Sequence, residues 1–238
     1  MIAQNANEKS DTGALYIVST PIGNLEDITL RALRILKEAD LICAEDTRKT
    51  RILLTHFNIN TPVTSYYEHN ERSKTPHIIQ KVKEGKKAAI VSEAGTPTIS
   101  DPGYRIIISA IQEGIPVIPI PGPSAAISAL SISGLPVHRF AFEGFLPAKP
   151  GKRRNFLHKL CNEERTLIFF ESPHRIVNTL CDLIEILGGD RNAALCRELT
   201  KIHEEVIYNP LALLLKTIEM KPIKGEITLV VEGNKRAK

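Results

Sequence analysis

The sequence predicts an α/β protein of two domains, in which a parallel α/β domain is followed by a domain built on a mixed sheet. The chain has 238 residues, which is long for one domain and comfortable for two. Short apolar strands alternate with amphipathic helices in the amino-terminal half, a pattern typical of a parallel sheet. Adjacent strands in the carboxyl-terminal half lack helical crossovers, which indicates partly antiparallel pairing. The Pro-Gly-Pro segment 121–123 marks the expected boundary, giving domains of residues 1–122 and 123–238.

The amino-terminal half repeats one unit of strand, small-residue loop and helix. The predicted strands are Ala14–Ser19, Leu41–Ala44, Lys87–Ser92 and Pro116–Ile120. The helix after the first strand is expected to be capped by Asp27 and to bury one apolar face. Glycine, proline and small hydroxyl residues follow the strands, and they let backbone approach a ligand closely. Because parallel sheets bind ligands beyond the carboxyl ends of their strands, we expect a small ligand there, held by backbone groups.

Motifs for phosphate binding are missing from these loops. The sequence contains neither GxGxxG nor GxxxxGK[ST], so dinucleotide binding and ATP hydrolysis lose support.

The carboxyl-terminal half is predicted to hold five strands and two well-marked helices. The strands are Arg139–Leu146, Thr166–Phe170, Asn192–Arg197, His203–Tyr208 and Gly225–Val231. Ser172 and Pro173 are expected to open one helix, which Gly188 and Gly189 end. A second helix is expected from Pro210 to about Lys216. Charged residues lie just outside the strand ends, and they predict a cleft with a small-residue floor and a charged rim.

Composition and charge limit the function without naming it. Hydrophobic residues make up 42% and charged residues 24%, which excludes a disordered chain. The formal net charge of +4 arises in residues 123–238 and is too small to establish a nucleic-acid partner. A local basic cluster is more suggestive, although it also fits a solvated helix start. The cluster consists of Lys149, Lys152, Arg153, Arg154 and Lys159.

Membrane and metal sites are not expected. The first thirteen residues are polar and lack the apolar core of a signal peptide. Residues 114–137 carry no charge, but their five prolines exclude a continuous spanning helix. The four cysteines show no metal-binding spacing with histidines. The sequence therefore favours a soluble, cytoplasmic protein that holds no metal.

Seven motifs, in order from about Leu15 to Gly233, carry a family resemblance. They are PIGNLED, EDTR, SEAGTPTISDPG, PGPSA, FEGFLPAK, ESPHR and RELTKIHEE. They closely resemble the ribosomal RNA small-subunit methyltransferase I family, within the tetrapyrrole (corrin/porphyrin) methylase superfamily. Two features depart from the family pattern. Glu93 stands where the family usually has aspartate, and the sequence ends at Lys238, where family members commonly continue into a small helical extension.

The resemblance implies a fold, a cofactor and a substrate. It implies that S-adenosylmethionine binds between the two domains of a homodimeric protein. The implied reaction is methylation of the ribose 2′-hydroxyl of cytidine 1402 in the decoding region of 16S RNA of the small ribosomal subunit. The second domain would complete the cofactor site and present the basic surface. The cofactor-binding residues carried over by motif are Pro21, Gly95, Thr96, Pro97, Ile99, Ser124, Ala125, Phe170, Leu199 and Gly225.

The ribose hydroxyl must lose its proton during or after attack, so a positioned carboxylate or water is needed. The candidates are Asp46, Glu45 and Glu171, because each follows a predicted strand. His174 is a further candidate, although a structural or RNA-contacting role is favoured for it. The residues expected to hold RNA phosphates are Arg48, Arg175, Lys201, Lys152, Arg153 and Arg154.

Other functions stay open at this point. The same fold would suit a small-molecule methylase that acts on a tetrapyrrole, although the many rim charges argue against a hydrophobic macrocycle. A non-catalytic RNA or ribosome-assembly binder that retains the cofactor fold is a second alternative. A metabolite sensor or nucleotide-binding protein is a third.

Overall fold

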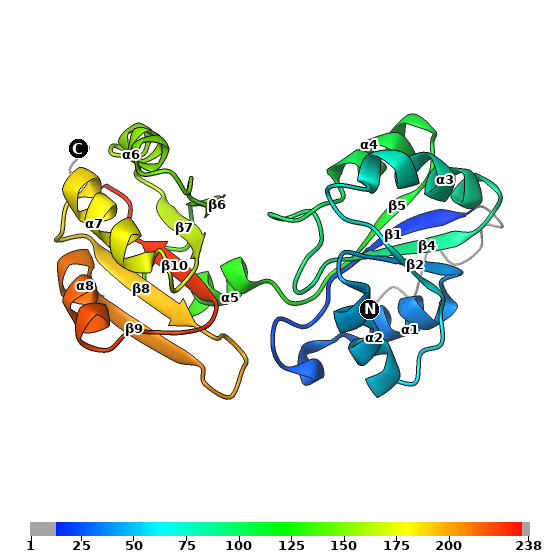
Figure 1. The fold of residues 1–238 in the computed structure, drawn as a ribbon, viewed down its shortest axis with the longest axis horizontal. Helices are drawn as coiled ribbons and strands as arrows, with labels where there is room; N and C mark the ends of the chain where they lie inside the picture. Colours follow the sequence, from blue (N-terminus) through cyan, green and yellow to red (C-terminus); the bar gives the residue numbers. More distant parts are fainter. Residues whose placement is uncertain (1–12, 235–238) are drawn as a thin grey trace. The chain divides into compact units, whose positions relative to one another are not determined.

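The computed structural model describes residues 13–234. The polar segment 1–12, which bears on the expected absence of a signal peptide, lies outside that range. The chain divides into two compact units, residues 1–123 and 124–238 (Figure 1). In the described range, no helix combines the length and the apolar character that crossing a bilayer requires.

The first unit is built on a sheet of five parallel strands. The strands are β1 (Ala14–Val18), β2 (Leu41–Ala44), β3 (Val63–Ser65), β4 (Lys87–Val91) and β5 (Val117–Ile120). Their order across the sheet is β3-β2-β4-β1-β5, and every pair is parallel. The connections contain η1 (Leu25–Asp27), α1 (Leu30–Glu38), α2 (Thr47–His56), α3 (Glu71–Lys83) and α4 (Tyr104–Gln112).

Helices cover both faces of this sheet (Figure 1). On one face, Leu36 of α1 and Leu54 of α2 pack in one buried cluster with strand residues such as Ile42. On the opposite face, α3 and α4 form a second cluster to which Val82 and Ile106 belong. The chain therefore leaves β1 and β2 toward one face and leaves β4, which lies between them, toward the other.

Two features of the first unit differ from the sequence prediction. β3 and α3 were not predicted, because β3 has only three half-buried residues and α3 carries an internal proline, Pro76. The predicted cap of the first helix is also wrong. Asp27 ends η1, and the Thr29 hydroxyl caps α1 by accepting a hydrogen bond from the backbone N–H of Ala32 at 3.1 Å.

The second unit contains a mixed sheet of five strands, as predicted. The strands are β6 (Phe140–Phe145), β7 (Thr166–Glu171), β8 (Asn192–Arg197), β9 (Glu205–Pro210) and β10 (Ile227–Val231). Their order is β6-β7-β10-β8-β9, and only β6 and β7 pair in parallel among these neighbours. The helices are α5 (Ala125–Ile132), α6 (Pro150–Lys159), α7 (Ile176–Leu187) and α8 (Leu211–Met220).

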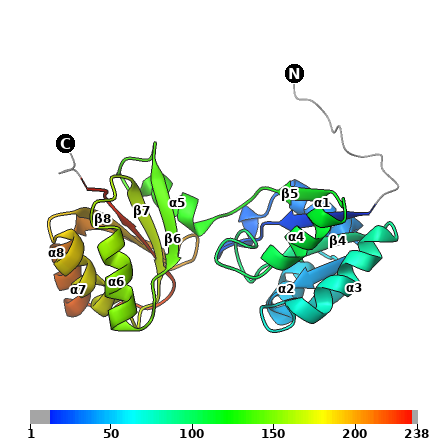
Figure 2. The same cartoon turned by 90° about the horizontal axis from the view of Figure 1, so that it is seen from above.

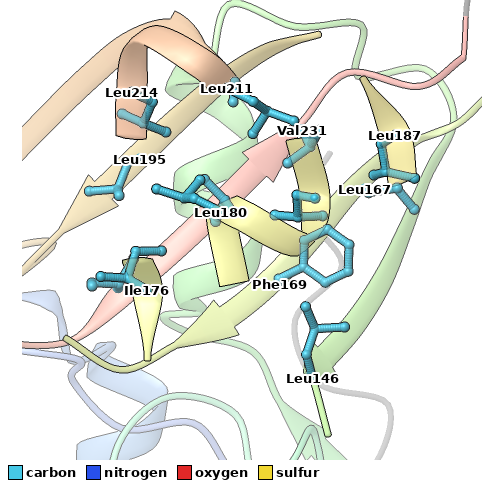
Figure 3. Packing of buried hydrophobic residues seen from close by; sticks show 14 of the residues in the cluster. Leu146, Leu167, Phe169, Ile176, Leu180, Leu187, Leu195, Leu211, Leu214 and Val231 are labelled. Carbon is cyan, nitrogen blue, oxygen red and sulfur yellow. The ribbon is translucent and has the colours of Figure 1, made fainter. Parts of the chain in front are cut away.

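The core of this unit lies between the sheet and three of its helices. Helices α6, α7 and α8 share one face, while α5 packs on β7 and β10 (Figure 2). Leu180 of α7 and Leu211 of α8 are fully buried against Phe169 and Leu195 of the strands (Figure 3). The sheet is therefore a rigid support for the loops at its strand ends.

The predicted start of α7 is wrong by one turn. The helix begins at Ile176, after a turn over residues 173–175, and Arg175 occupies the N-cap position. Ser172 contributes its carbonyl oxygen, which accepts hydrogen bonds from the backbone N–H groups of Arg175 and Ile176, both at 3.1 Å. Gly188, with φ of 100°, ends the helix as predicted.

Candidate functional site

Strand β4 is the place in the first unit where ligand binding is most favoured. In open parallel sheets, ligands bind where chains leave neighbouring strands toward opposite faces. This happens on both sides of β4, at its junction with β1 and at its junction with β2. We call these the β1–β4 junction and the β2–β4 junction.

The β1–β4 junction is a tightly bonded set of small residues. Thr20 and Gly95 exchange two backbone hydrogen bonds, of 2.9 and 3.0 Å. The hydroxyls of Ser19 and Thr96 lie 3.0 Å apart, and that of Thr96 also bonds the carbonyl of Pro123 at 3.1 Å. Gly95 has φ of 76°, a conformation that side chains rarely adopt. These bonds fix the start of the loop that follows β4.

Two further features of this junction fit a ligand. The Thr20 hydroxyl oxygen is buried and has no hydrogen-bond partner within the described residues, which calls for an explanation in a folded protein. Thr98 and Ser100 have φ of 74° and 63°, and such conformations gather at ligand-binding loops. Ile99, between them, is exposed.

The β2–β4 junction holds a pocket of about 520 Å³. Its wall comes from the loops after β2, β3 and β4 and from the first residues of α3 and α4. The lining residues are Glu45, Tyr67, Glu68, Glu71, Ser100, Asp101, Pro102, Gly103 and Tyr104. Of these, only Glu45 was predicted as a site residue, although Asp101 belongs to the SEAGTPTISDPG motif.

Among the carboxyl groups that line this pocket, that of Asp101 has a clearly shifted pKa. Burial and the negative charges of Glu45 and Glu93 raise its pKa to about 6, while a hydrogen bond with Ser92 acts in the opposite direction. A carboxyl that titrates near neutral pH is suited to proton transfer.

The two candidate bases after β2 have different surroundings. Asp46 is the N-cap of α2 and accepts hydrogen bonds from the backbone of Arg48 and Lys49 at 2.8 and 3.4 Å. The hydrogen bonds from the Arg48 side chain and backbone lower the pKa of Asp46. Glu45 lines the pocket and accepts a 3.1 Å hydrogen bond from the backbone of Glu93. Position thus favours Glu45 over Asp46 for contact with a ligand.

Glu93, the departure from the family pattern, is exposed. It forms an ion pair with Lys49 of α2. Its longer side chain therefore links the loop after β4 to α2, beside the pocket.

Glu171, the third candidate base, is buried in the second unit. Its carboxylate accepts hydrogen bonds from the Ser172 backbone at 2.8 Å and from the Thr179 hydroxyl at 2.6 Å. It also pairs with Arg175, whose guanidinium donates to the carbonyl of Leu146 at 2.6 Å. These contacts hold the turn before α7, and they do not favour Glu171 as a base or Arg175 as a phosphate ligand. His174, in the same turn, is exposed.

Lys201 lies in a compact loop between β8 and β9. Its ammonium pairs with Glu198 at 2.9 Å and Glu226 at 3.1 Å. Burial lowers the pKa of Lys201, but these two pairs outweigh it and raise the pKa overall. Glu198 also lies over Gly225, whose φ is 93°. Gly225 therefore lies against the residue that precedes Leu199.

The other predicted cofactor residues of the second unit occupy two places. Ser124 and Ala125 open α5, and both are half-buried. Phe170, near the end of β7, packs its ring on Phe142 and Phe145 with centroid distances of 4.9 and 5.6 Å. Phe145 is exposed, so this aromatic group reaches the surface of the unit.

The predicted basic cluster is divided by the structure. Arg153 is buried and pairs with Asp182, so the prediction that it binds phosphate is not supported. Arg154 is half-buried and forms an ion pair with Glu185. Lys149, Lys152 and Lys159 are exposed. The cluster thus offers three exposed lysines instead of five basic groups.

Within residues 13–234, no group of three or more histidine, cysteine or acidic side chains is arranged to hold a metal ion.

Comparison with known proteins identifies close relatives. A protein of Halalkalibacterium halodurans named ribosomal RNA small subunit methyltransferase I is 52% identical over 97% of this chain and 80% of its own length. Proteins of the same name from Escherichia coli O157:H7 and Thermotoga maritima are each 49% identical, over 98% and 93% of this chain and 82% and 99% of their own lengths.

Solved structures show the same fold at low sequence identity. Uroporphyrin-III-C-methyltransferase from Thermus thermophilus has a TM-score of 0.65 and 23% identity, covering 92% of this chain and 94% of its own. The complex of that enzyme with S-adenyl homocysteine gives a TM-score of 0.64 at 19% identity, covering 92% and 97%. The family model of tetrapyrrole (corrin/porphyrin) methylases matches residues 14–214. The chain therefore belongs to the tetrapyrrole methylases and, within them, to the ribosomal RNA small subunit methyltransferase I family.

Proposed function

We propose that this protein uses S-adenosylmethionine to methylate the ribose 2′-hydroxyl of cytidine 1402 in 16S RNA of the small ribosomal subunit. The observation that carries this proposal is the identity of 52% over nearly the whole chain with a relative named for ribosomal RNA methylation. Tetrapyrrole methylases share the fold at only 17–23% identity. The specific relationship thus favours RNA over a tetrapyrrole as the substrate.

In this proposal, S-adenosylmethionine binds at the β1–β4 junction. The unpartnered Thr20 hydroxyl and the left-handed loop around Thr98 fit a ligand held by backbone groups. S-adenosylmethionine, when bound, supplies a methyl group on a sulfonium. From the first unit, the residues that would hold it are Pro21, Gly95, Thr96, Pro97 and Ile99. From the second, they are Ser124, Ala125, Phe170, Leu199 and Gly225.

The chain's own residues would orient the RNA and remove a proton. Of the three residues predicted as bases, Glu45 is the one that lines the pocket at the β2–β4 junction, where it would contact the RNA nucleoside. The exposed cations Arg48 and Lys152 would meet phosphates as point charges that fix the RNA without reading its bases, although the Arg48 guanidinium also pairs with Asp46 at 3.2 Å. Lys201 would also bind RNA phosphate, with its ammonium held in position by Glu198 and Glu226.

Assembly and location are part of the same proposal. We expect a homodimer, with the apolar helix α5 as a candidate contact surface, because Ile127 and Ile132 are exposed on it. We expect the protein to act in the cytoplasm, where its ribosomal substrate is assembled.

The test is methyl transfer from radiolabelled S-adenosylmethionine to small subunits from cells that lack this activity. Label on the ribose of cytidine 1402 is the expected result. Subunits from cells that contain the activity serve as the control, because their target is already methylated and should take up little label. Cofactor binding without label on RNA would contradict the proposal. It would favour a non-catalytic binder or, if a tetrapyrrole accepts label, a small-molecule methylase.

A further inference from the structure

We infer that the pocket at the β2–β4 junction receives the target cytidine, turned out of the RNA, and that Asp101 accepts the proton of its 2′-hydroxyl. This inference rests on the proposed function and names the substrate-binding residues that the function requires. It concerns nine lining residues, of which only Glu45 was predicted from the sequence.

The pocket has the size and chemistry of a nucleoside site. Its volume of about 520 Å³ lies within the range of about 300–1,000 Å³ that is usual for small-ligand sites. Tyr67 and Tyr104 are exposed at its wall and offer aromatic faces on which an unstacked base can lie. Enzymes that modify a nucleotide commonly extrude it into such a pocket.

The negative charge of the pocket favours entry of the nucleoside and disfavours entry of its phosphates. Glu45, Glu68, Glu71 and Asp101 line it, and carboxylates accept hydrogen bonds from the amino group of cytosine and from ribose hydroxyls. The same charges repel phosphate, so the nucleoside would enter while its phosphates stay outside. At position 4 cytosine carries an amino donor and uracil a carbonyl acceptor, so a carboxylate that faces this position would favour cytidine over uridine.

The loop after β4 joins this pocket to the proposed cofactor site. Residues 95–97 and 99 are among the proposed cofactor residues, and Ser100 is the first pocket residue that follows. Gly103 has φ of 127°, and a Cβ atom there would lie 2.8 Å from Cγ2 of Thr98. The loop is thus folded back on itself. In this inference, residues 95–104 would contact both S-adenosylmethionine and the target cytidine.

Asp101 is the pocket carboxyl on the loop that leaves β4, two residues past Ile99 of the proposed cofactor site, and its position there makes it our choice of proton acceptor. Its pKa of about 6, raised by burial and by Glu45 and Glu93, lets it bind a proton in the reaction and release it at neutral pH. The nearby cations are already paired, Lys49 with Glu93 and Arg105 with Glu71. Glu68 and the two tyrosines complete the titratable groups that line the pocket.

The step balances without any further reactant. A new bond forms between the ribose 2′-oxygen and the methyl carbon, while the carbon–sulfur bond breaks and its electron pair stays on sulfur. The hydroxyl proton passes to the carboxylate of Asp101 and then to water. The products are 2′-O-methylcytidine in the RNA and S-adenosylhomocysteine.

The first test replaces the proposed acceptor by its uncharged isostere. Asp101→Asn is compared with Glu113→Gln, a matched carboxylate-to-amide change at an exposed site just past α4 that pairs with Lys83. Single-turnover methyl transfer to small subunits is measured from pH 5 to 8.5, and cofactor affinity is measured by calorimetry. We expect the rate of the unsubstituted protein to rise with pH with a midpoint near 6. Asp101→Asn should lose roughly 10²- to 10⁴-fold in rate and lose this midpoint, with cofactor affinity unchanged.

The second test measures the affinity of the protein for small subunits instead of the rate of methyl transfer. Tyr104→Ala removes an aromatic face, and we expect its affinity for small subunits to fall roughly 5- to 100-fold. Filter binding without cofactor measures this, again against Glu113→Gln. Unchanged affinity of Tyr104→Ala, or an unchanged rate and pH profile of Asp101→Asn, would overturn the inference. If the unsubstituted protein and Glu113→Gln label no RNA, it is the proposed function that fails.

Discussion

Arg153 and Asp182 form an ion pair inside the second unit, with Nε of the arginine 2.6 Å from Oδ2 of the aspartate. Both side chains are buried, and the pair links α6 to α7. A charge left alone in such a place is costly, because it has neither water nor a partner. Arg153 is therefore expected to act on stability.

Arg153→Ala should lower the free energy of unfolding by about 1–3 kcal/mol, since Asp182 loses its short buried hydrogen bond and keeps only the longer contact with Arg154 at 3.6 Å. Arg154→Ala is the neighbouring control. Its pair with Glu185 is partly exposed and its contact with Asp182 is the longer one, at 3.6 Å, so the loss should be below about 1 kcal/mol. Urea unfolding of the two variants measures the difference. Equal losses would show that burial of the first pair is unimportant.

Glu171→Gln tests whether this carboxylate holds the turn before α7. The amide keeps the shape of the side chain but leaves Arg175 facing a neutral group, so we expect a loss of about 1–3 kcal/mol in unfolding free energy. Glu219→Gln, at an exposed position of α8, should be nearly neutral. The pH midpoint of methyl transfer should stay in place, and its disappearance would identify Glu171 as a base.

Asp101 should make stability depend on pH in a direction opposite to that of most carboxylates. Its folded pKa of about 6 lies above the unfolded value of about 3.9. The folded state therefore binds the proton more strongly, and stability falls as pH rises from about 4 to 6. Since Asp101 is only partly buried, screening reduces the effect to on the order of 1 kcal/mol.

Asp101→Asn should consequently raise the melting temperature at pH 7.5 and leave it unchanged at pH 4. Thermal unfolding followed by circular dichroism at both pH values measures this. A lower melting temperature at pH 7.5 would mean that the charged carboxylate stabilises the loop.

Gly103→Ala should disturb the loop after β4. The new methyl group would lie 2.8 Å from Cγ2 of Thr98, at a φ of 127° that alanine rarely adopts. We expect a loss of about 1–3 kcal/mol and slower methyl transfer. Gly114→Ala is the matched control, because Gly114 also has positive φ but has open space around it. A backbone cost should lower the stability of both variants, more at Gly103 because its φ lies outside the left-handed helical region, and only Gly103→Ala should reduce the rate.

The four cysteines should differ sharply in reactivity. Burial raises the pKa of Cys43 and of Cys196 to about 12, so neither forms a thiolate near neutral pH. Cys181 is exposed. Iodoacetamide at pH 8, followed by peptide mass spectrometry, should label Cys181 first and leave Cys43 and Cys196 unmodified until the protein is unfolded. Labelling of Cys43 in the native protein would contradict its placement in the core.

The sequence predicts long or strongly apolar elements well and short ones poorly. Strands Leu41–Ala44 and Asn192–Arg197 have the predicted bounds, because apolar runs between turn residues leave little choice. Val63–Ser65 was missed because its pairing with β2 defines it more than its own three residues do. The predicted cap at Ser172 is wrong because Ser172 uses its carbonyl, and not its side chain, to start the turn.

The candidate site was predictable only in part, because some of its residues follow an element that the sequence does not reveal. The loop around Gly95 stands out in the sequence by its small residues and follows a recognisable strand. The pocket depends on Tyr67 and Glu68, which follow the missed strand β3, and on their approach to Asp101 from a different loop. Such a meeting of segments follows from the strand order, which no local pattern records. The same holds for Arg153, whose burial depends on a partner in another helix.

The position of β4 between two junctions gives the first unit a modular plan. The segment from Glu45 to Glu71 contributes to the pocket, while the loop after β1 contributes to the bonded set around Thr20 and Gly95. Among the described residues, the loop that leaves β4 contributes both to the pocket and to the bonded set. An exchange of residues 45–71 between relatives would therefore change one part of the pocket wall and leave the bonded set around Thr20 and Gly95 as it is. The wall of the pocket can thus vary by exchange of one segment, without rebuilding the junction on the other side of β4.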